Sequence, residues 1–78
     1  MTRQNLIVVR GNKTQSEVAK TLRISQKYLS KIELGQRTPS AYLLAKMSEY
    51  YNKPLDTLFP DIFLKLYTPK RSKSVDDA

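Results

Sequence analysis

Thr14–Gly35 has the sequence TQSEVAKTLRISQKYLSKIELG and carries the clearest structural signal in the chain. Thr14 and Glu17 have the spacing of a capping box, in which an N-cap side chain and the glutamate three residues later each bond the other's backbone N–H. Apolar side chains follow at helical spacing on one face, at Val18, Ala19 and Leu22. The pattern predicts a helix over residues 15–22.

A second helix follows after a very short connection. Only Arg23 and Ile24 separate the first helix from Ser25, a residue type that favours the N-cap position. We expect the second helix to continue from Ser25 through Leu34 and to end at Gly35, since glycine commonly follows the last helical turn. Two short helices joined so closely must cross steeply, as they do in a helix-turn-helix.

Further helices are predicted on both sides of this pair. Residues 4–11 are expected to be helical, although β-branching in this run would also suit a strand. Ser40 is expected to cap a helix that ends before Asn52 and Pro54, and a short helix follows before Pro60. The apolar stripe of the longer helix consists of Leu43, Leu44, Met47 and Tyr51, and the short helix contains Leu55, Leu58 and Phe59.

These elements predict an all-α protein. We expect a compact five-helix domain over residues 1–60 and a C-terminal extension over residues 61–78, of which residues 68–78 form a polar tail that is expected to be disordered. The predicted core consists of Leu6, Val9, Val18, Ala19, Leu22, Leu29, Ile32, Leu43, Leu44 and Met47.

Apolar residues after Pro60 exceed what this core needs, and exposed patches of that kind usually mark interfaces. We therefore predict a homodimer formed through the C-terminal part. Its predicted surface consists of Leu58, Phe59, Ile62, Phe63, Leu64, Leu66 and Tyr67. The alternative is that residues 62–67 fold back onto their own domain, and the pattern suits either a short helix or a strand.

Cysteine and histidine are both absent from the 78 residues, which removes disulfides, thiol nucleophiles, the commonest zinc ligands and the usual neutral-pH general base. Glu17 and Glu33 have no metal-ligand cluster or glycine-rich loop nearby in sequence, so we do not expect acid–base catalysis. We expect no catalytic residue, no metal and no cofactor. No apolar run approaches the roughly 20 residues that span a bilayer, and no signal peptide is visible, so a cytoplasmic protein is expected.

Positive charge is concentrated in one part of the chain. Fourteen Lys and Arg against seven Asp and Glu give a net charge of +7. Arg10–Arg37 holds seven basic and two acidic residues, a net of +5, whereas Thr38–Pro69 holds three of each. An excess of lysine can simply keep a small protein soluble. Its concentration in one segment instead favours a nucleic-acid partner.

On the second helix of the pair, Leu29 and Ile32 are expected to point inward. The residues expected to point nearly the opposite way are Lys27, Ser30, Lys31 and Leu34. Lys27 and Lys31 stand at i and i+4, where like charges repel, and a polyanion would turn that cost into attraction. An ordinary solvated face is the alternative. Four of the five tyrosines, Tyr28, Tyr42, Tyr50 and Tyr51, could stack on single-stranded bases, but three of these four lie on or beside the fourth helix, which favours packing.

As an ordered set, these features resemble the Cro and repressor type of helix-turn-helix regulators, across Leu6–Phe59. The residues that carry the resemblance are Thr14-Gln15, Glu17-Val18-Ala19, Leu22, Ile24-Ser25, Tyr28-Leu29-Ser30-Lys31-Ile32-Glu33, Gly35, Arg37, Pro39-Ser40, Leu55-Asp56 and Leu58-Phe59. The resemblance implies a lambda-repressor-like fold that docks the helix after Ser25 in the major groove, normally as a dimer on a palindromic site of double-stranded DNA.

Residue roles follow from the resemblance by position. Gln15 matches a residue that grips a phosphate, and Gln26, Lys27 and Lys31 match base-contacting positions. Backbone-contacting or supporting positions are matched by Ser25, Tyr28, Ser30 and Arg37. Arg10 and Glu33 match an internal ion pair between the first and third helices.

The chain departs from the family pattern in three places. Arg23 stands where the family usually has a glycine with a left-handed backbone, which costs roughly 1 kcal/mol for a residue with a Cβ. Leu34 stands where members often have a phosphate-binding asparagine. The segment between Arg10 and Gln15 is about two residues shorter than usual, which predicts a tight loop.

The leading functional hypothesis is a sequence-specific transcriptional regulator, a repressor or controller of a mobile element, of bacterial or phage origin and associated with the nucleoid. The alternative is a protein-interaction module, such as an antitoxin that also binds DNA and holds a protein partner through the patch around residues 62–67.

Overall fold

Side-chain caps determine where the central helices begin. The Thr14 hydroxyl accepts from the Glu17 backbone N–H (3.1 Å) while the Glu17 carboxylate accepts from the Thr14 N–H (2.8 Å), so the predicted capping box is present. Ser25 and Ser40 cap the next two helices in the same way, each bonding the N–H three residues on. The helices that follow are α2 (Gln15–Leu22), α3 (Gln26–Glu33) and α4 (Ala41–Tyr51).

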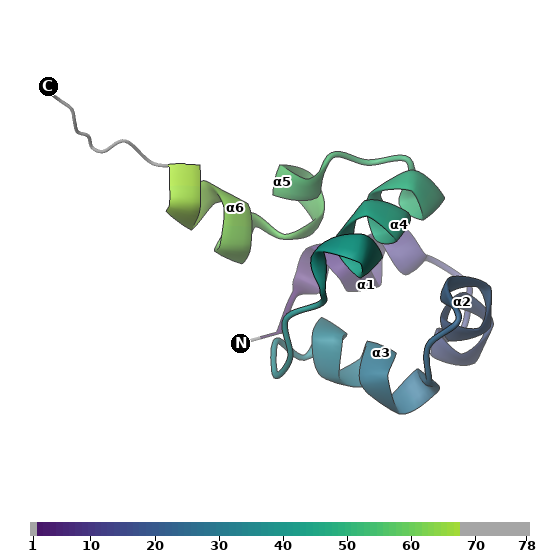
Figure 1. Cartoon of the computed structure of the whole chain (residues 1–78). Coiled ribbons are helices and arrows are strands. Elements are labelled where there is room, and N and C mark those ends of the chain that lie inside the picture. The colour runs from purple at the N-terminus through teal and green to yellow at the C-terminus, as the bar shows by residue number, and fades with distance from the viewer. Residues whose placement is uncertain (1, 68–78) are drawn as a thin grey trace, which may run out of the picture.

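The computed structural model describes residues 2–67, and within this range the secondary structure is entirely helical (Figure 1). Three elements join those above: α1 (Gln4–Arg10), α5 (Leu55–Leu58) and α6 (Pro60–Tyr67). The predicted all-α class is confirmed. The prediction for the tail at residues 68–78 lies outside the described range. No helix within residues 2–67 is long and apolar enough to cross a membrane.

Left-handed backbone conformations end two of the helices. Arg23 has φ 61° and ψ 42° after α2, which confirms the conformation expected at this turn, and Asn52 has φ 55° after α4. Between α1 and α2 the chain turns at Gly11 (φ 61°), and the Lys13 N–H bonds the Arg10 carbonyl across a short loop. Of these turns, the one at Arg23 joins α2 to α3, which pack directly on each other.

The core forms where α1 to α5 converge (Figure 1). Eight of the predicted core residues are buried, and Val9 and Leu44 pack partly buried against them. The buried eight are Leu6, Val18, Ala19, Leu22, Leu29, Ile32, Leu43 and Met47.

Leu58 and Phe59 are core residues, which corrects their assignment to a surface for a second chain. Both are 0% exposed in the single chain, and Phe59 is the largest fully buried side chain of the described residues. The reason is the position of α5, which packs against α1 and α4 and turns the end of the helix inward. Burial of two such side chains contributes about 1.5–3 kcal/mol each to stability.

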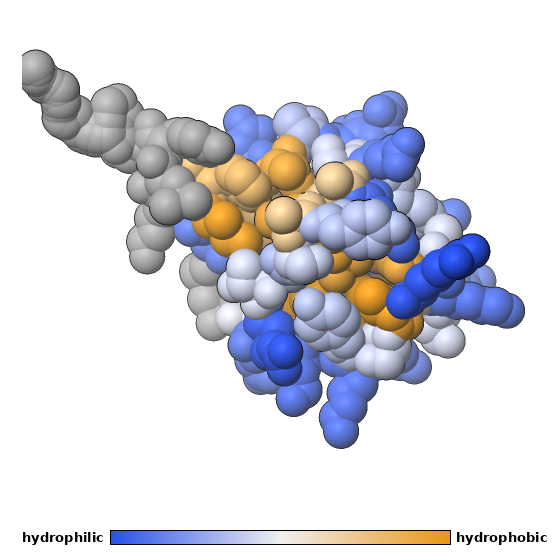
Figure 2. Space-filling model, viewed as in Figure 1, coloured by the Kyte–Doolittle hydropathy of each residue, from blue (hydrophilic) through white to orange (hydrophobic). Residues whose placement is uncertain are grey.

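The sequence pattern suited either a short helix or a strand after Pro60, and residues 60–67 form a helix. The N–H groups of Ile62 and Phe63 both bond the Phe59 carbonyl, so α6 continues almost directly from α5. Ile62 and Phe63 pack partly buried against the core. The far end of α6 leads away from the other helices (Figure 1), and hydrophobic side chains gather where α6 joins the domain (Figure 2). The predictions for Leu64, Leu66 and Tyr67 concern side chains that lie outside the described ones.

We predict that Arg23→Gly stabilises the protein by roughly 1 kcal/mol, because glycine adopts φ 61° without the Cβ clash that arginine carries there. Asn52→Gly is the matched control, since asparagine tolerates the left-handed region and has less to gain. Urea unfolding measures both. A loss of stability in Arg23→Gly would mean that the arginine side chain makes a compensating contact.

Candidate nucleic-acid interface

The outward face of α3 is polar and basic, as the helical spacing predicted. Leu29 and Ile32 are buried, whereas Gln26 and Lys27 are exposed and Lys31 is half-buried. The Ser25 hydroxyl is engaged as the α3 cap, 3.0 Å from the Tyr28 N–H. The first turn of α3 is therefore held in place while its two leading side chains extend into solvent.

Three cations gather around one shallow cavity of about 250 Å³ at this face. Its lining consists of Ser25, Lys27, Tyr28, Lys31 and Arg37, with no carboxylate among them. Arg37 comes from the loop between α3 and α4, and its guanidinium lies 5.7 Å from the centroid of the Tyr28 ring. This cation–π contact places Arg37 beside the lysines of α3. Three positive charges around one polar hollow favour an anionic occupant.

The ion pair implied by the resemblance is present beneath this face. Arg10 Nε lies 2.8 Å from Glu33 Oε2, and Arg10 Nη2 lies 3.2 Å from Glu33 Oε1. The Glu33 side chain is 2% exposed, so its charge depends on this partner. Gln15 Nε2 also donates to Glu33 Oε1 (2.9 Å). One buried carboxylate thus joins α1, α2 and α3.

Gln15, which matches a phosphate-gripping position, is half-buried at the start of α2. Its bond to Glu33 uses one amide N–H, and the side chain carries a second N–H and a carbonyl oxygen. Because the carboxylate can only accept, it orients the amide nitrogen of Gln15 inward. Ser30 is half-buried, and Leu34, the C-cap residue of α3, is 43% exposed.

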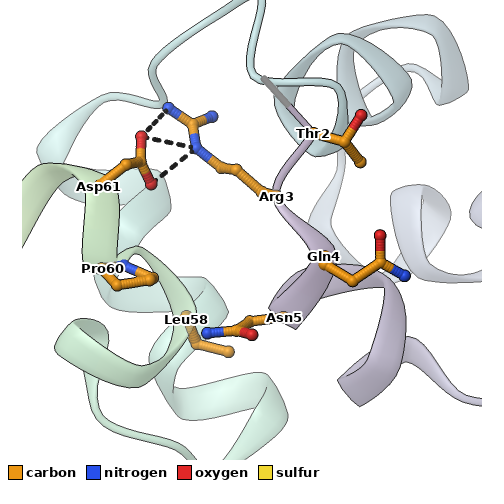
Figure 3. A pocket seen from close by; sticks show the side chains of 7 residues that line it. All are labelled: Thr2, Arg3, Gln4, Asn5, Leu58, Pro60 and Asp61. Carbon is orange, nitrogen blue, oxygen red and sulfur yellow. Dashed lines mark hydrogen bonds and ion pairs between the residues drawn. The ribbon is translucent and has the colours of Figure 1, made fainter.

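Arg3 is a structural residue that the sequence analysis did not identify. It is 6% exposed, and its Nη1 donates to the backbone carbonyls of Ile32 and Arg37, both at 2.8 Å. Its Nε and Nη2 donate to the Asp61 carboxylate (Figure 3). No local pattern in the sequence could have shown this pairing, because the two residues lie 58 positions apart.

The packing interpretation of the tyrosines is right for two of the three on α4 and wrong for Tyr42. Tyr50 and Tyr51 are half-buried and meet edge to face with ring centroids 5.0 Å apart. Tyr42 is 74% exposed on the first turn of α4, where Lys46 Nζ lies 5.3 Å from its ring. The apolar stripe of α4 faces the core, and Tyr42 lies one position before it.

Among the described residues, Tyr51 has the one strongly shifted pKa. Its hydroxyl is buried and has no hydrogen-bond partner within residues 2–67. Burial, with a smaller contribution from the Glu33 carboxylate, raises the pKa of Tyr51 from 10.0 to about 12. The hydroxyl is therefore neutral at any physiological pH.

Comparison with known proteins adds one match. The model of a family described as helix-turn-helix matches residues 7–58, two thirds of the chain, and includes all five residues around the basic cavity. No curated protein matches the chain.

We predict that stability falls as the pH rises from 10 to about 12 and that Tyr51→Phe removes part of this fall. A raised pKa in the folded state means that the unfolded chain loses its proton first, so the stabilisation is present below pH 10 and disappears through the folded pKa. Because the Tyr51 side chain is only partly buried, we expect a difference on the order of 1 kcal/mol at pH 12.

Thermal unfolding of the two proteins across this range measures the effect, and the difference between the curves isolates Tyr51 from the other tyrosines. At pH 7 Tyr51→Phe should be neutral or stabilising by about 1 kcal/mol, since it removes an unpaired buried hydroxyl. Parallel curves from pH 7 to pH 12 would contradict the prediction.

Proposed function

The chain belongs to the helix-turn-helix family of the Cro and repressor type, and on this basis we propose that it is a sequence-specific transcriptional regulator that docks α3 in the major groove of double-stranded DNA. The observation that carries the proposal is the basic cavity, at which Lys27, Lys31 and Arg37 meet on the outward side of α3. A B-DNA major groove is about 12 Å wide and admits one α-helix.

In this proposal base edges are contacted from the first two turns of α3. Gln26 and Lys27 are exposed at its N-terminal end, and Lys31 follows one turn later on the same face. A glutamine amide can bond adenine through two atoms, and a lysine can donate to guanine O6 and N7. These three side chains are our candidates for sequence discrimination.

Contacts to the DNA backbone are assigned to residues at the edges of α3. Gln15 at the start of α2 has a further N–H that can donate to a phosphate, and Arg37 lines the same cavity as the two lysines. Ser25, Tyr28 and Ser30 complete this set as hydroxyl donors or supports. Such contacts set the register of the protein on the duplex without carrying sequence information.

We further propose that the protein acts as a repressor or controller of a mobile element, in the cytoplasm and on the nucleoid. This part of the proposal rests on the roles that are typical of regulators in this family. A repressor of this type acts by occupying its operator, so the proposal requires neither catalysis nor a cofactor.

Dimerisation through α6 is the last part of the proposal. A single recognition helix contacts few base pairs, and two copies on a palindrome double the contact. Ile62 and Phe63 are only partly covered by their own domain, and α6 extends beyond the other helices (Figure 1). Since Leu58 and Phe59 are buried, the proposed contact is restricted to α6 itself.

We predict that Lys27→Ala and Lys31→Ala each weaken operator binding by about 1–3 kcal/mol and leave the melting temperature nearly unchanged. Both side chains line the cavity and neither belongs to the core. Lys53→Ala, which removes an exposed lysine after α4, is the matched control for loss of one charge. Fluorescence anisotropy on operator and random duplexes measures the effect, and an equal loss on both would show phosphate contact only.

We predict that truncation after Asp61 converts a dimer into a monomer and weakens operator binding by about 10²-fold, because two linked half-site contacts become one. Truncation after Tyr67 is the control, since it removes the tail and keeps α6 whole. Sedimentation analysis gives the oligomeric state. A dimer that persists after truncation at Asp61 and binds its operator undiminished would refute the proposed interface.

A further inference from the structure

We propose that Arg3 is a positioning residue. It couples the packing of α6 against the domain to the position of the Arg37 side chain at the basic cavity around Lys27 and Lys31. The proposal rests on the proposed function, because it assumes that the cavity binds DNA. It assigns a role in DNA binding to two residues, Arg3 and Asp61, that lie outside the recognition surface.

One side of the Arg3 guanidinium holds the end of α3 and the loop after it. Both N–H groups of Nη1 have an acceptor, the carbonyls of Ile32 and Arg37, each at 2.8 Å. The backbone N–H of Arg3 also donates to the Glu33 carbonyl at 2.7 Å. The last carbonyls of a helix have no partner within it, so Arg3 supplies donors where α3 ends.

The other side of the guanidinium holds the first turn of α6. Nε lies 3.2 Å from both Asp61 oxygens, and Nη2 lies 3.1 Å from Oδ2. The guanidinium also lies 5.3 Å from the centroid of the Phe59 ring, which limits its rotation. A planar fork of this kind cannot turn toward one partner without leaving the other.

Asp61 is the accessible member of the pair. The Arg3 side chain is 4% exposed and the Asp61 side chain is 22% exposed. Both residues border a cavity of about 400 Å³ between the start of α1 and the α5–α6 junction (Figure 3). A movement of α6 that separates Asp61 from Arg3 therefore begins at the wall of this cavity, and the packing of Ile62 and Phe63 on the core opposes it.

Loss of Asp61 as a partner must affect Arg37. A buried guanidinium without its carboxylate is costly, so Arg3 would turn toward water and leave the carbonyls that it bonds. The Arg37 carbonyl would then lose its donor, and the loop that places the Arg37 side chain over Tyr28 would relax. The result is a coupling, through Arg3, between the position of α6 and the basic cavity that Arg37 lines.

This coupling predicts an effect opposite in sign to that of simple electrostatics. Asp61→Asn raises the net charge from +7 to +8, and added positive charge alone strengthens attraction to DNA. Coupling through Arg3 instead predicts weaker operator binding. Asp56→Asn is the matched control, because it makes the same charge change at an exposed residue of α5.

We expect Asp61→Asn to weaken operator binding by about tenfold and to lower the slope of log K against log salt by about 0.9, as for loss of one phosphate contact. Asp56→Asn should bind as tightly as the original protein or more tightly. In an Arg37→Ala background, Asp61→Asn should cause no further loss. Circular dichroism at 10 °C gives the folded fraction of each variant, and sedimentation gives its oligomeric state.

Three results would overturn the proposal: Asp61→Asn binding as tightly as Asp56→Asn, the full loss persisting in the Arg37→Ala background, or the loss arising only because the variant has become monomeric. Arg3→Lys, which keeps the charge and lacks the fork, provides a second variant with the same expected pattern. Failure of the proposed function is distinguishable, because the original protein would then show no preference for an operator over random DNA.

Hydrogen exchange on the original protein requires no variant. Coupling is reciprocal, so operator binding must slow exchange at the Arg3 Nε–H. Unchanged exchange at this site would contradict the proposal.

Discussion

The buried carboxylate of Glu33 is the point on which the three N-terminal helices depend. It accepts from Arg10 on α1 and Gln15 on α2 while itself belonging to α3, and its backbone carbonyl accepts from the Arg3 N–H. A carboxylate that is 2% exposed is tolerable only if its partners stay in place. The geometry that satisfies Glu33 is therefore the geometry that brings α2 and α3 together and turns the opposite side of α3 to solvent.

Both ends of α3 are held from within the domain. At its N-terminus the Ser25 hydroxyl accepts from the Tyr28 N–H, and at its C-terminus the Ile32 carbonyl accepts from the Arg3 side chain as well as from the Gly35 N–H. The left-handed turn at Arg23 sets the direction in which α3 leaves α2. A helix fixed in this way loses little further freedom when it binds, so its outward side chains can contact a ligand with a small entropic cost.

The C-terminal part both completes the core and extends away from it. Leu58 and Phe59 close the space between α1 and α4, while α6 begins immediately afterwards and is held to the domain by Asp61. Ile62 and Phe63 of α6 also pack partly buried against the core. The ion pair with Arg3 connects the first turn of α6 to the loop that carries Arg37.

Local chemistry in the sequence was sufficient for the boundaries of α2, α3 and α4, because a cap such as Thr14 or Ser25 bonds a backbone group only three residues away. Helical periodicity predicted which side chains of α3 point toward the core, and the family resemblance predicted the Arg10–Glu33 ion pair. The burial of Leu58 and Phe59, the exposure of Tyr42 and the Arg3–Asp61 pair depend on how the helices cross. A contact over 58 positions forms only when intervening turns have set the directions of several helices, and no spacing in the chain encodes those directions.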